Sequence, residues 1–312
     1  MPGQLVLAGD PMQLGPIVTS ELCKNFQMDR SYMERLVQTS PAYSLQHNAN
    51  AYPPHLITLL VNNYRFHPEI LKLPNELFYR NQLIARGAIF QTHSMVKWEY
   101  LPAKDFPILF HAVDGENTRE GSSPSWFNPQ EAMVAVEYVQ KLVKDSKPKI
   151  SPEDIGIITP YARQVQKIRT ALAVSNIDGI KVGSVETFQG QERRVIIIST
   201  VRSENSLLQH DLRYNLGFVA NEKRFNVAVT RAKSLLIVVG NPRVLETDTK
   251  NWLPLLKFCK SKNSWVGEDW DEGTSPESDD DVDAEKESTE AVDKDEWAAA
   301  AQESYCFVNR ED

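Results

Sequence analysis

Residues 221–240 read NEKRFNVAVTRAKSLLIVVG, a basic, helix-like run that passes directly into an apolar strand. At about 100° per residue, Arg224 and Arg231 would project from one face of a helix over 221–233. A guanidinium stays charged and donates bidentately to phosphate oxygens. Because residues 234–240 are too apolar for the surface, a merely solvated basic helix is the weaker interpretation. The run predicts two arginines that converge on a phosphate.

The start of the chain holds a second polar segment after an apolar run. Residues 4–8 (QLVLA) predict a buried strand, and residues 9–16 (GDPMQLGP) predict the loop that follows it. The carboxyl ends of strands are where α/β proteins bind their ligands. Gln13 could hold a water molecule or a phosphate in that loop.

Two further segments repeat this design. Residues 59–68 (LLVNNYRFHP) predict a short strand that ends at Tyr64 and Arg65, where an aromatic face beside a cation suits a nucleobase beside its phosphates. Residues 182–192 (VGSVETFQGQE) predict a third polar strand end. Gly190 would let the backbone approach a ligand closely, and Glu192 could accept hydrogen bonds from ribose hydroxyls.

Apolar runs and helical patterns alternate along the chain. Strands are expected at 4–8, 56–61, 107–113, 155–159, 180–185, 194–201 and 234–240, and helices at about 67–80, 129–144, 162–174, 221–233 and 250–261. The helix at 129–144 has a complete start signal, with Asn128 as N-cap, Pro129 at N1 and Glu131 at N3. This alternation predicts an α/β fold whose mostly parallel sheet is covered by helices on both faces.

Composition narrows the function further. The chain has 312 residues and a net charge of −8, but from residue 268 to the end there are 18 acidic and 3 basic residues. Residues 1–267 therefore carry 34 − 3 = 31 basic and 42 − 18 = 24 acidic residues, a net +7 that is compatible with nucleic-acid binding. Three scattered cysteines indicate neither a disulfide framework nor a zinc site. We expect no signal peptide and no membrane span.

Other enzyme classes find little support. His67 and His111 have no second metal ligand nearby in the sequence, so we expect no metal site. No serine or cysteine lies in a Gly-x-Ser-x-Gly turn, which argues against a hydrolase triad. The acidic segment that follows the last apolar run is too poor in large apolar groups to fold and is predicted to be disordered. Trp270 and Trp297 within it are either stray aromatic residues or short docking motifs.

The polar segments, taken in order, resemble motifs III, IV, V and VI of the superfamily 1 helicases. The resemblance covers residues 1 to about 265 and is strongest to the Upf-like branch, above all the Armitage or Moloney-virus-ten-like RNA helicases of small-RNA silencing. It rests on residues 7–16 (LAGDPMQLGP), 119–128 (REGSSPSWFN), 183–192 (GSVETFQGQE) and 224–233 (RFNVAVTRAK). It implies a RecA-like sheet, ATP with Mg²⁺ as cofactors, and RNA as ligand.

One departure from the family pattern limits the activity expected of this chain. No Gly-x-x-x-x-Gly-Lys-Ser/Thr loop occurs in the sequence, and no Asp-Glu pair is available for magnesium, since Asp10 belongs to motif III. We therefore expect the C-terminal part of a longer helicase, with the magnesium ligands outside this chain. By itself the chain is predicted to be inactive.

The resemblance also implies roles for individual residues. Gln13 would sense the γ-phosphate or its attacking water, while Arg65 and Arg231 would stabilise charge on the transferred phosphoryl group. In the nucleotide-contacting set, Tyr64 would face adenine, and Gly190 and Glu192 would contact phosphate and ribose. Arg224 belongs to the same set, and its more specific role would be to couple its helix to the motif V loop. The RNA-contacting set would be Thr159, Pro160, Tyr161, Ser184 and Thr187. The alternative for this last set is structural, with Pro160 ending a strand and Tyr161 capping the core.

These inferences predict three regions. Residues 1–50 would be a remnant of a first RecA-like domain with its linker, residues 51–265 the second RecA-like domain, and residues 266–312 a disordered acidic tail that competes with RNA. The expected function is ATP-driven 5′ to 3′ translocation on single-stranded RNA. Expected partners are the first domain and small-RNA silencing proteins, in the cytoplasm and its ribonucleoprotein granules. Two alternatives remain, a DNA-directed helicase of the same superfamily and a non-catalytic RNA-binding adaptor.

Overall fold

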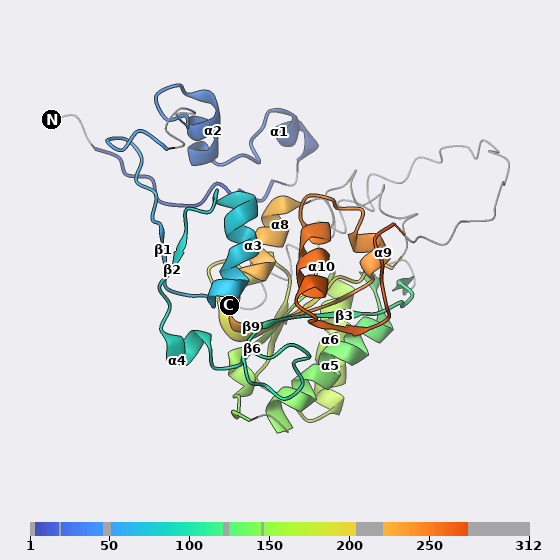
Figure 1. Ribbon diagram of the computed structural model, residues 1–312. Coiled ribbons are helices and arrows are strands. Elements are labelled where there is room, and N and C mark those ends of the chain that lie inside the picture. Colours follow the sequence, from blue (N-terminus) through green and yellow to red (C-terminus); the bar gives the residue numbers. More distant parts are fainter. Residues whose placement is uncertain are drawn as a thin grey trace.

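A six-stranded sheet forms the centre of the molecule, with strand order β10-β3-β9-β8-β6-β7 and every neighbouring pair parallel (Figure 1). The computed structural model describes residues 4–18, 20–45, 51–120, 125–144, 147–203 and 221–273. The strands of the sheet are β3 (Ile108–Ala112), β6 (Ile155–Ile158), β7 (Lys181–Gly183), β8 (Arg193–Ser199), β9 (Ala232–Gly240) and β10 (Trp265–Gly267).

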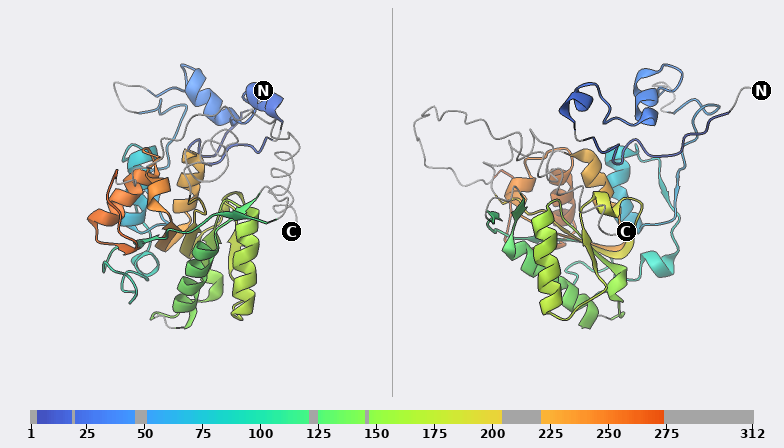
Figure 2. Two further views of the ribbon diagram at one scale, coloured as in Figure 1. Left: turned by 90° about the vertical axis from the view of Figure 1, so that its right-hand side faces the viewer. Right: turned by 180° about the vertical axis from the view of Figure 1, so that it is seen from behind.

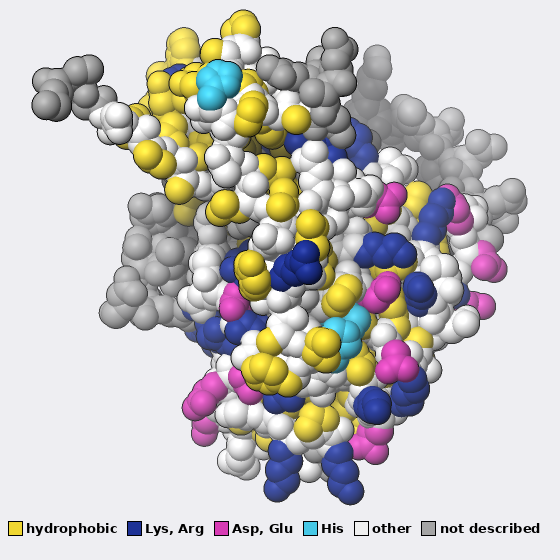
Figure 3. Space-filling model, turned by 60° about the vertical axis from the view of Figure 1, so that its left-hand side comes forward, with side chains coloured by type: hydrophobic (Ala, Val, Ile, Leu, Met, Phe, Trp, Pro, Cys, Tyr) yellow, Lys and Arg dark blue, Asp and Glu magenta, His cyan; other side chains and the backbone are white. Residues whose placement is uncertain are grey.

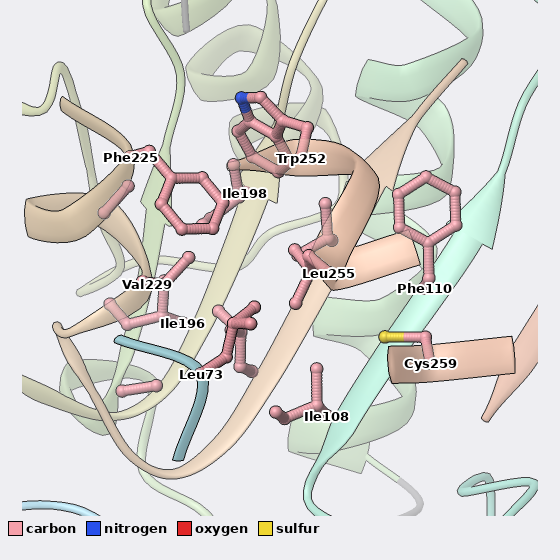
Figure 4. Close-up of a cluster of buried hydrophobic side chains, with 14 of the residues drawn as sticks. Leu73, Ile108, Phe110, Ile196, Ile198, Phe225, Val229, Trp252, Leu255 and Cys259 are labelled. Carbon is pink, nitrogen blue, oxygen red and sulfur yellow. The ribbon is translucent and has the colours of Figure 1, made fainter. Parts of the chain in front are cut away.

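Both faces of the sheet are buried, which explains why its strands are apolar without interruption. Along β8, Val195 and Ile197 face one cluster of buried side chains, and Ile196 and Ile198 face the other. Helices α5 (Pro129–Lys144) and α6 (Ala162–Val174) cover the first face. The second face is covered by α3 (Pro68–Phe78), α8 (Glu222–Val229), α9 (Pro242–Leu245) and α10 (Trp252–Ser261) (Figure 2). Figure 4 shows this second core, in which Phe225 and Trp252 pack over the sheet.

The expected helix starts are observed where the capping signals were strongest. Helix α5 spans residues 129–144 as predicted, and the backbone N–H of Glu131 donates to Oδ1 of Asn128 at 3.0 Å. Helix α6 likewise spans 162–174. The remaining elements are α1 (Glu21–Asn25), α2 (Tyr32–Thr39), α4 (Ile89–Thr92), β1 (Asn62–Asn63), β2 (Ile84–Ala85), β4 (Thr118–Arg119), β5 (Trp126–Phe127), η1 (Pro152–Asp154) and η2 (Glu186–Phe188).

Two of the predicted strands are wrong. Residues 4–8 form no strand, and Leu5 and Val6 are 78% and 88% exposed. The apolar run at 56–61 is also irregular, and only the two residues of β1 after it pair, with β2. A strand needs a hydrogen-bonding neighbour along its length. The run at 56–61 has one only at its last residue, where the Val61 carbonyl accepts from the N–H of Ile84 at 2.8 Å. Apolar content alone therefore overstated the regular structure of this half.

The N-terminal segment crosses above α3 and α8 (Figure 1). It is held there by side-chain contacts, including a hydrogen bond of 2.7 Å from the Tyr79 hydroxyl to Asp10 and an ion pair of 2.6 Å between Lys223 and Glu34. Hydrophobic side chains gather at the top of the face in Figure 3. Several hydrophobic side chains of the N-terminal segment are exposed, among them Leu5, Val6 and Ile17. The segment is thus docked by its polar groups and leaves apolar groups outside.

The folded part ends later than predicted. Residues 265–267 form β10, which pairs with β3, although the acidic tail was expected to begin at 266. Trp270 is only 6% exposed, stacks on Trp265 with ring centroids 5.7 Å apart, and donates from Nε1 to Glu246 at 2.8 Å. It is a packed residue of the folded part, which corresponds to neither of the two alternatives that the sequence offered. Residues 274–312, with Trp297, lie outside the described residues.

Candidate functional site

Three of the predicted site residues, Arg65, Glu192 and Arg231, lie together at the amino ends of β8 and β9. Arg65 follows β1 in a turn closed by Oδ1 of Asn63, which accepts from the backbone N–H of Arg65 at 3.0 Å. Its guanidinium forms an ion pair with Glu192, just before β8, and Glu192 also pairs with Lys233 at 2.9 Å. Burial opposes ionisation of Glu192, yet these two cations keep its pKa below the usual value.

Arg231 completes this cluster from the turn between α8 and β9. Its side chain is buried, with 1% exposure, and its three nitrogens donate to the carbonyls of Val227 (3.0 Å) and Gln191 (3.2 Å) and to Oγ1 of Thr230 (3.2 Å). Burial first, and then the nearby Arg65 charge, lower the pKa of Arg231 to about 10, so it remains charged at neutral pH.

The predicted convergence of Arg224 and Arg231 is wrong. Helix α8 ends at Val229 with Thr230 as its C-cap, because β9 begins at Ala232 to pair with Arg193 of β8. The helical period therefore does not extend to Arg231. Arg224 instead donates from Nε to Glu186 of η2 at 3.0 Å, and its charge, working against burial, keeps the pKa of Glu186 low. This contact joins α8 to the motif V loop, as a coupling residue would.

Polar segments were expected at the carboxyl ends of strands, and Arg65 does follow β1 in this way, whereas Glu192 precedes β8 and Arg231 precedes β9. Parallel strands bring Arg193 of β8 and Ala232 of β9 to one edge, and the arginine cluster forms at that amino edge. The segments at 59–65 and 182–192 reach this amino edge as loops that connect other elements of the fold. Sequence could show polar residues next to apolar runs, but it could not show which end of the sheet each connection reaches.

Gln13 lies near this cluster through a short network. Its Nε2 donates to Oδ2 of Asp10 at 2.9 Å, and the same oxygen accepts from the Tyr79 hydroxyl at 2.7 Å. Tyr64 has a side chain free to stack, since it is 70% exposed. Gly190 is exposed and has φ = +76°, a conformation that glycine adopts without strain.

The predicted RNA-contacting residues form a separate group at the opposite edge of the sheet. β6 and β7 pair, so that the N–H of Thr159 donates to the Gly183 carbonyl at 3.1 Å. Ser184 follows β7, and its carbonyl accepts from Oγ1 of Thr187 at 2.8 Å. Pro160, Ser184 and Thr187 are half-buried.

Tyr161 and Thr159 are less available than the RNA-contact prediction requires. Tyr161 is 5% exposed and Thr159 is fully buried. The Arg202 guanidinium lies over the Tyr161 ring, 5.1 Å from its centroid. Tyr161 thus does what the structural alternative expected of it, which is to pack at the end of β6.

Four residues of the arginine cluster and its network were not predicted as site residues. They are Asp10, Tyr79, Asn226 and Lys233. Lys233 ends the basic run and could have been identified from its charge, whereas nothing local distinguishes Tyr79, which is brought to the network by the register of α3 against α8. Among the described residues, no three His, Cys, Asp or Glu side chains gather as a metal site, and no helix is long and apolar enough to span a bilayer.

The residues present suit the phosphate end of a nucleotide. Arg65, Arg231 and Lys233 bring three positive charges to a site where Glu192 and Asp10 are the described carboxylates that oppose them. Guanidinium and ammonium donors match phosphate oxygens. The exposed ring of Tyr64 next to them could take a base. The described carboxylates near the cluster, Glu192 and Asp10, are already bound to cations or hydrogen-bond donors.

Comparisons with known proteins identify the family of this chain. Residues 28–243 match the family described as an AAA domain. The chain is 48% identical over 278 residues to "Putative helicase mov-10-B.1" of Danio rerio, covering 86% of this chain and 27% of that protein. It is 51% identical over 250 residues to "RNA helicase Mov10l1" of Homo sapiens (79% and 20%) and 39% identical over 276 residues to "Probable RNA helicase armi" of Drosophila melanogaster (85% and 23%). The chain spans about a quarter of the length of these relatives.

Proposed function

The chain belongs to the AAA domain family and is homologous to RNA helicases of the MOV10 and Armitage group, and on this premise we propose that it is the second RecA-like domain of an ATP-dependent RNA helicase. In this proposal residues 1–50 belong to a first RecA-like domain and its linker. That first domain would supply the Walker loop and the magnesium ligands. The motif resemblance extends the proposal to 5′ to 3′ translocation on single-stranded RNA, to small-RNA silencing and to a cytoplasmic location.

One observation carries the proposal, the excess of positive charge at the arginine cluster. The charge of Arg65 lowers the pKa of Arg231, which means that the two guanidiniums repel each other across a partly buried site. Glu192 offsets only part of this repulsion, because it also pairs with Lys233. An anionic phosphate placed between the arginines would relieve it.

Bound ATP would supply the phosphoryl group that is transferred to water. Arg65 would hold a phosphate oxygen after leaving Glu192, and Arg231, fixed by three hydrogen bonds, would keep its charge aimed at the developing negative charge. Gln13 would orient the attacking water, and Tyr64 would stack on adenine. The loop over residues 184–192 begins at the RNA edge and ends at the arginine cluster, so it would connect the two ligands.

The test replaces the arginines in a polypeptide that carries this chain together with a Gly-Lys-Thr/Ser phosphate loop. An arginine that stabilises a transferred phosphoryl group is worth on the order of 10³ to 10⁵ in rate. We expect Arg231→Ala and Arg65→Ala to lower RNA-stimulated ATP turnover by about this factor and to leave RNA affinity within about twofold. Lys257→Ala, an exposed cation on the outer helix α10, is the control and should change neither value.

Other outcomes would point to other functions. Equal losses of turnover and RNA affinity would make the arginines contacts to the RNA backbone, and near-normal turnover would make them structural. Residues 1–312 alone should not turn over ATP, because they lack the phosphate loop. Competition between single-stranded RNA and DNA of one sequence would separate an RNA helicase from a DNA-directed relative. RNA binding without turnover in the extended polypeptide would favour the adaptor.

A further inference from the structure

A continuous chain of hydrogen bonds runs from Gln13 to Arg231. Asp10 Oδ2 accepts from both Gln13 Nε2 (2.9 Å) and the Tyr79 hydroxyl (2.7 Å). The Tyr79 oxygen in turn accepts from Nδ2 of Asn226 on α8 (2.8 Å). The same Nδ2 also donates to the backbone carbonyl of Met12 in the Gln13 loop (2.9 Å). The backbone carbonyl of Asn226 accepts from Oγ1 of Thr230 (2.6 Å), and that hydroxyl accepts from Nη2 of Arg231 (3.2 Å).

The middle of this chain is shielded from water. Asn226 is fully buried and Thr230 is 4% exposed. Burial, followed by the Asp10 charge, raises the pKa of the Tyr79 hydroxyl above its ordinary value, so it stays protonated and donates to Asp10. Hydrogen bonds are stronger in such surroundings than in water. A buried polar group that loses its partner destabilises the folded state.

Each bond has an ordinary explanation when taken alone. A threonine hydroxyl in a helix often donates to the carbonyl four residues earlier, and a tyrosine can simply dock a neighbouring segment. The shared atoms go beyond these explanations. Asp10 Oδ2 is shared by Gln13 and Tyr79, and Thr230 Oγ1 is shared by the Asn226 carbonyl and Arg231. A movement of Gln13 therefore changes the partners of Tyr79, and a movement of Asn226 shifts the Thr230 oxygen that accepts from Arg231.

We propose that Tyr79, Asn226 and Thr230 are positioning residues that tie the Gln13 loop to Arg231, so that the two groups adopt their hydrolysis geometry together. This inference rests on the proposed function, because it concerns the same phosphoryl transfer. The three side chains touch no part of the nucleotide in this scheme. They act only through the two ends that do.

The first test removes single hydroxyls in the extended polypeptide with the phosphate loop. Tyr79→Phe and Thr230→Val keep the shape of each side chain and cut the chain of hydrogen bonds at two places that do not touch each other. We expect each to lower kcat about tenfold while KM for ATP and Kd for RNA stay within about twofold. The loss in the double variant should be smaller than the product of the two single losses, because both hydroxyls belong to one network, in which Asn226 also holds the Met12 carbonyl.

Tyr138→Phe is the matched control. Its hydroxyl is bonded to His111 at 2.7 Å, and its side chain is buried in the opposite core. Its kcat should equal that of the parent. The proposal is overturned if Tyr79→Phe keeps the parent kcat, if KM rises with kcat unchanged, or if the losses in the double variant multiply.

A second test works on residues 1–312 and needs no turnover. The N–H groups of Met12 and Gln13 donate to Oδ1 and to the carbonyl of Asp10 (2.9 and 3.1 Å). Tyr79→Phe should release Asp10 and so speed hydrogen exchange at residues 9–16, while Tyr138→Phe should not. Unchanged exchange would overturn the inference whatever the enzymatic result. A parent polypeptide without RNA-stimulated turnover would instead defeat the proposed function and leave this test standing.

Discussion

Glu131 shows how a single buried residue fixes the connection that follows β8. Its carboxylate accepts from Oγ of Ser199 at 2.6 Å and from the backbone N–H of Val201 at 2.9 and 3.0 Å. Val201 has φ = +74°, which is strained for a β-branched side chain. The carboxylate therefore holds a strained turn in place. Next along the chain, Arg202 packs on Tyr161 at the predicted RNA edge.

The same burial makes stability depend on pH. Burial raises the pKa of Glu131 from 4.5 to about 7, against the effect of its hydrogen bonds. The folded state thus binds a proton more tightly than the unfolded state, so this group lowers stability as pH rises from about 4.5 to about 7 and adds no further change above that. The difference corresponds to roughly 3 kcal/mol.

We predict that Glu131→Gln removes the loss of stability that the parent protein shows between about pH 4.5 and about pH 7. The glutamine oxygen can accept from Ser199 and Val201, and its amide can donate to Thr200, as a protonated glutamate would. At pH 8 the variant should unfold at a higher temperature than the parent, by about 2 to 4 °C per kcal/mol recovered. At pH 5 the two should be nearly equal. Glu137→Gln, on the exposed side of α5, is the control, and a parallel pH profile for all three proteins would contradict the prediction.

Residue types were predicted more accurately than their contacts. Arg65, Arg231 and Glu192 were identified from segments far apart in the sequence, and the fold brings them together. Arg224 was placed with them by helical period, but the helix ends two residues before Arg231. The end of that helix depends on where β9 must begin to pair with β8, and such a long-range constraint has no local signal.

At the level of elements, the success of prediction followed the strength of local signals. Helix α5 was correct to the residue because Asn128 caps it, and β6, β8 and β9 were found because strands buried on both faces are apolar throughout. Strand β10 was missed because it is short and precedes acidic residues. It exists because β3 offers it a free edge and Trp265 stacks on Phe110, with ring centroids 4.6 Å apart.

This edge predicts a role for Trp270 in stability. Its ring stacks on Trp265, and its Nε1 donates to Glu246. Replacing a buried tryptophan by alanine usually costs about 3 to 5 kcal/mol. Because Trp270 lies at the margin of the core, we expect Trp270→Ala to lower the free energy of unfolding in urea by about 3 kcal/mol with an unchanged m value. Trp297→Ala is the matched control in the acidic C-terminal segment. Equal effects of the two would show that Trp270 does not anchor the edge.

At the scale of the whole molecule, the two groups of predicted ligand-contacting residues lie at opposite ends of one sheet. The arginine cluster is at the amino ends of β8 and β9, and the predicted RNA group is at the carboxyl ends of β6 and β7. The loop over 184–192 joins them along the chain, and Arg224 fixes that loop to α8. The sheet is thus the rigid element across which nucleotide and RNA binding would be coupled in the proposed function.

Charged residues are unevenly distributed along the chain. Residues 274–312 contain 14 acidic and 3 basic residues, so residues 1–273 carry 34 − 3 = 31 basic and 42 − 14 = 28 acidic residues, a net +3. An acidic segment with a net charge of −11 in the same chain can occupy the cationic surface that RNA would use. Such competition is electrostatic and weakens as salt screens it.

Deleting residues 274–312 should therefore strengthen RNA binding, and most at low salt. Fluorescence anisotropy with a labelled single-stranded RNA should give a Kd several-fold lower than that of the parent at about 50 mM salt, and this difference should disappear near about 500 mM. A chain whose 14 tail carboxylates are replaced by amides should behave like the deletion, because the charge and not the length of the segment competes. The cut must follow Gly273, since removal of Trp270 would alter the fold as well. Equal affinities of parent and deletion at low salt would contradict competition and leave the acidic segment without influence on the RNA surface.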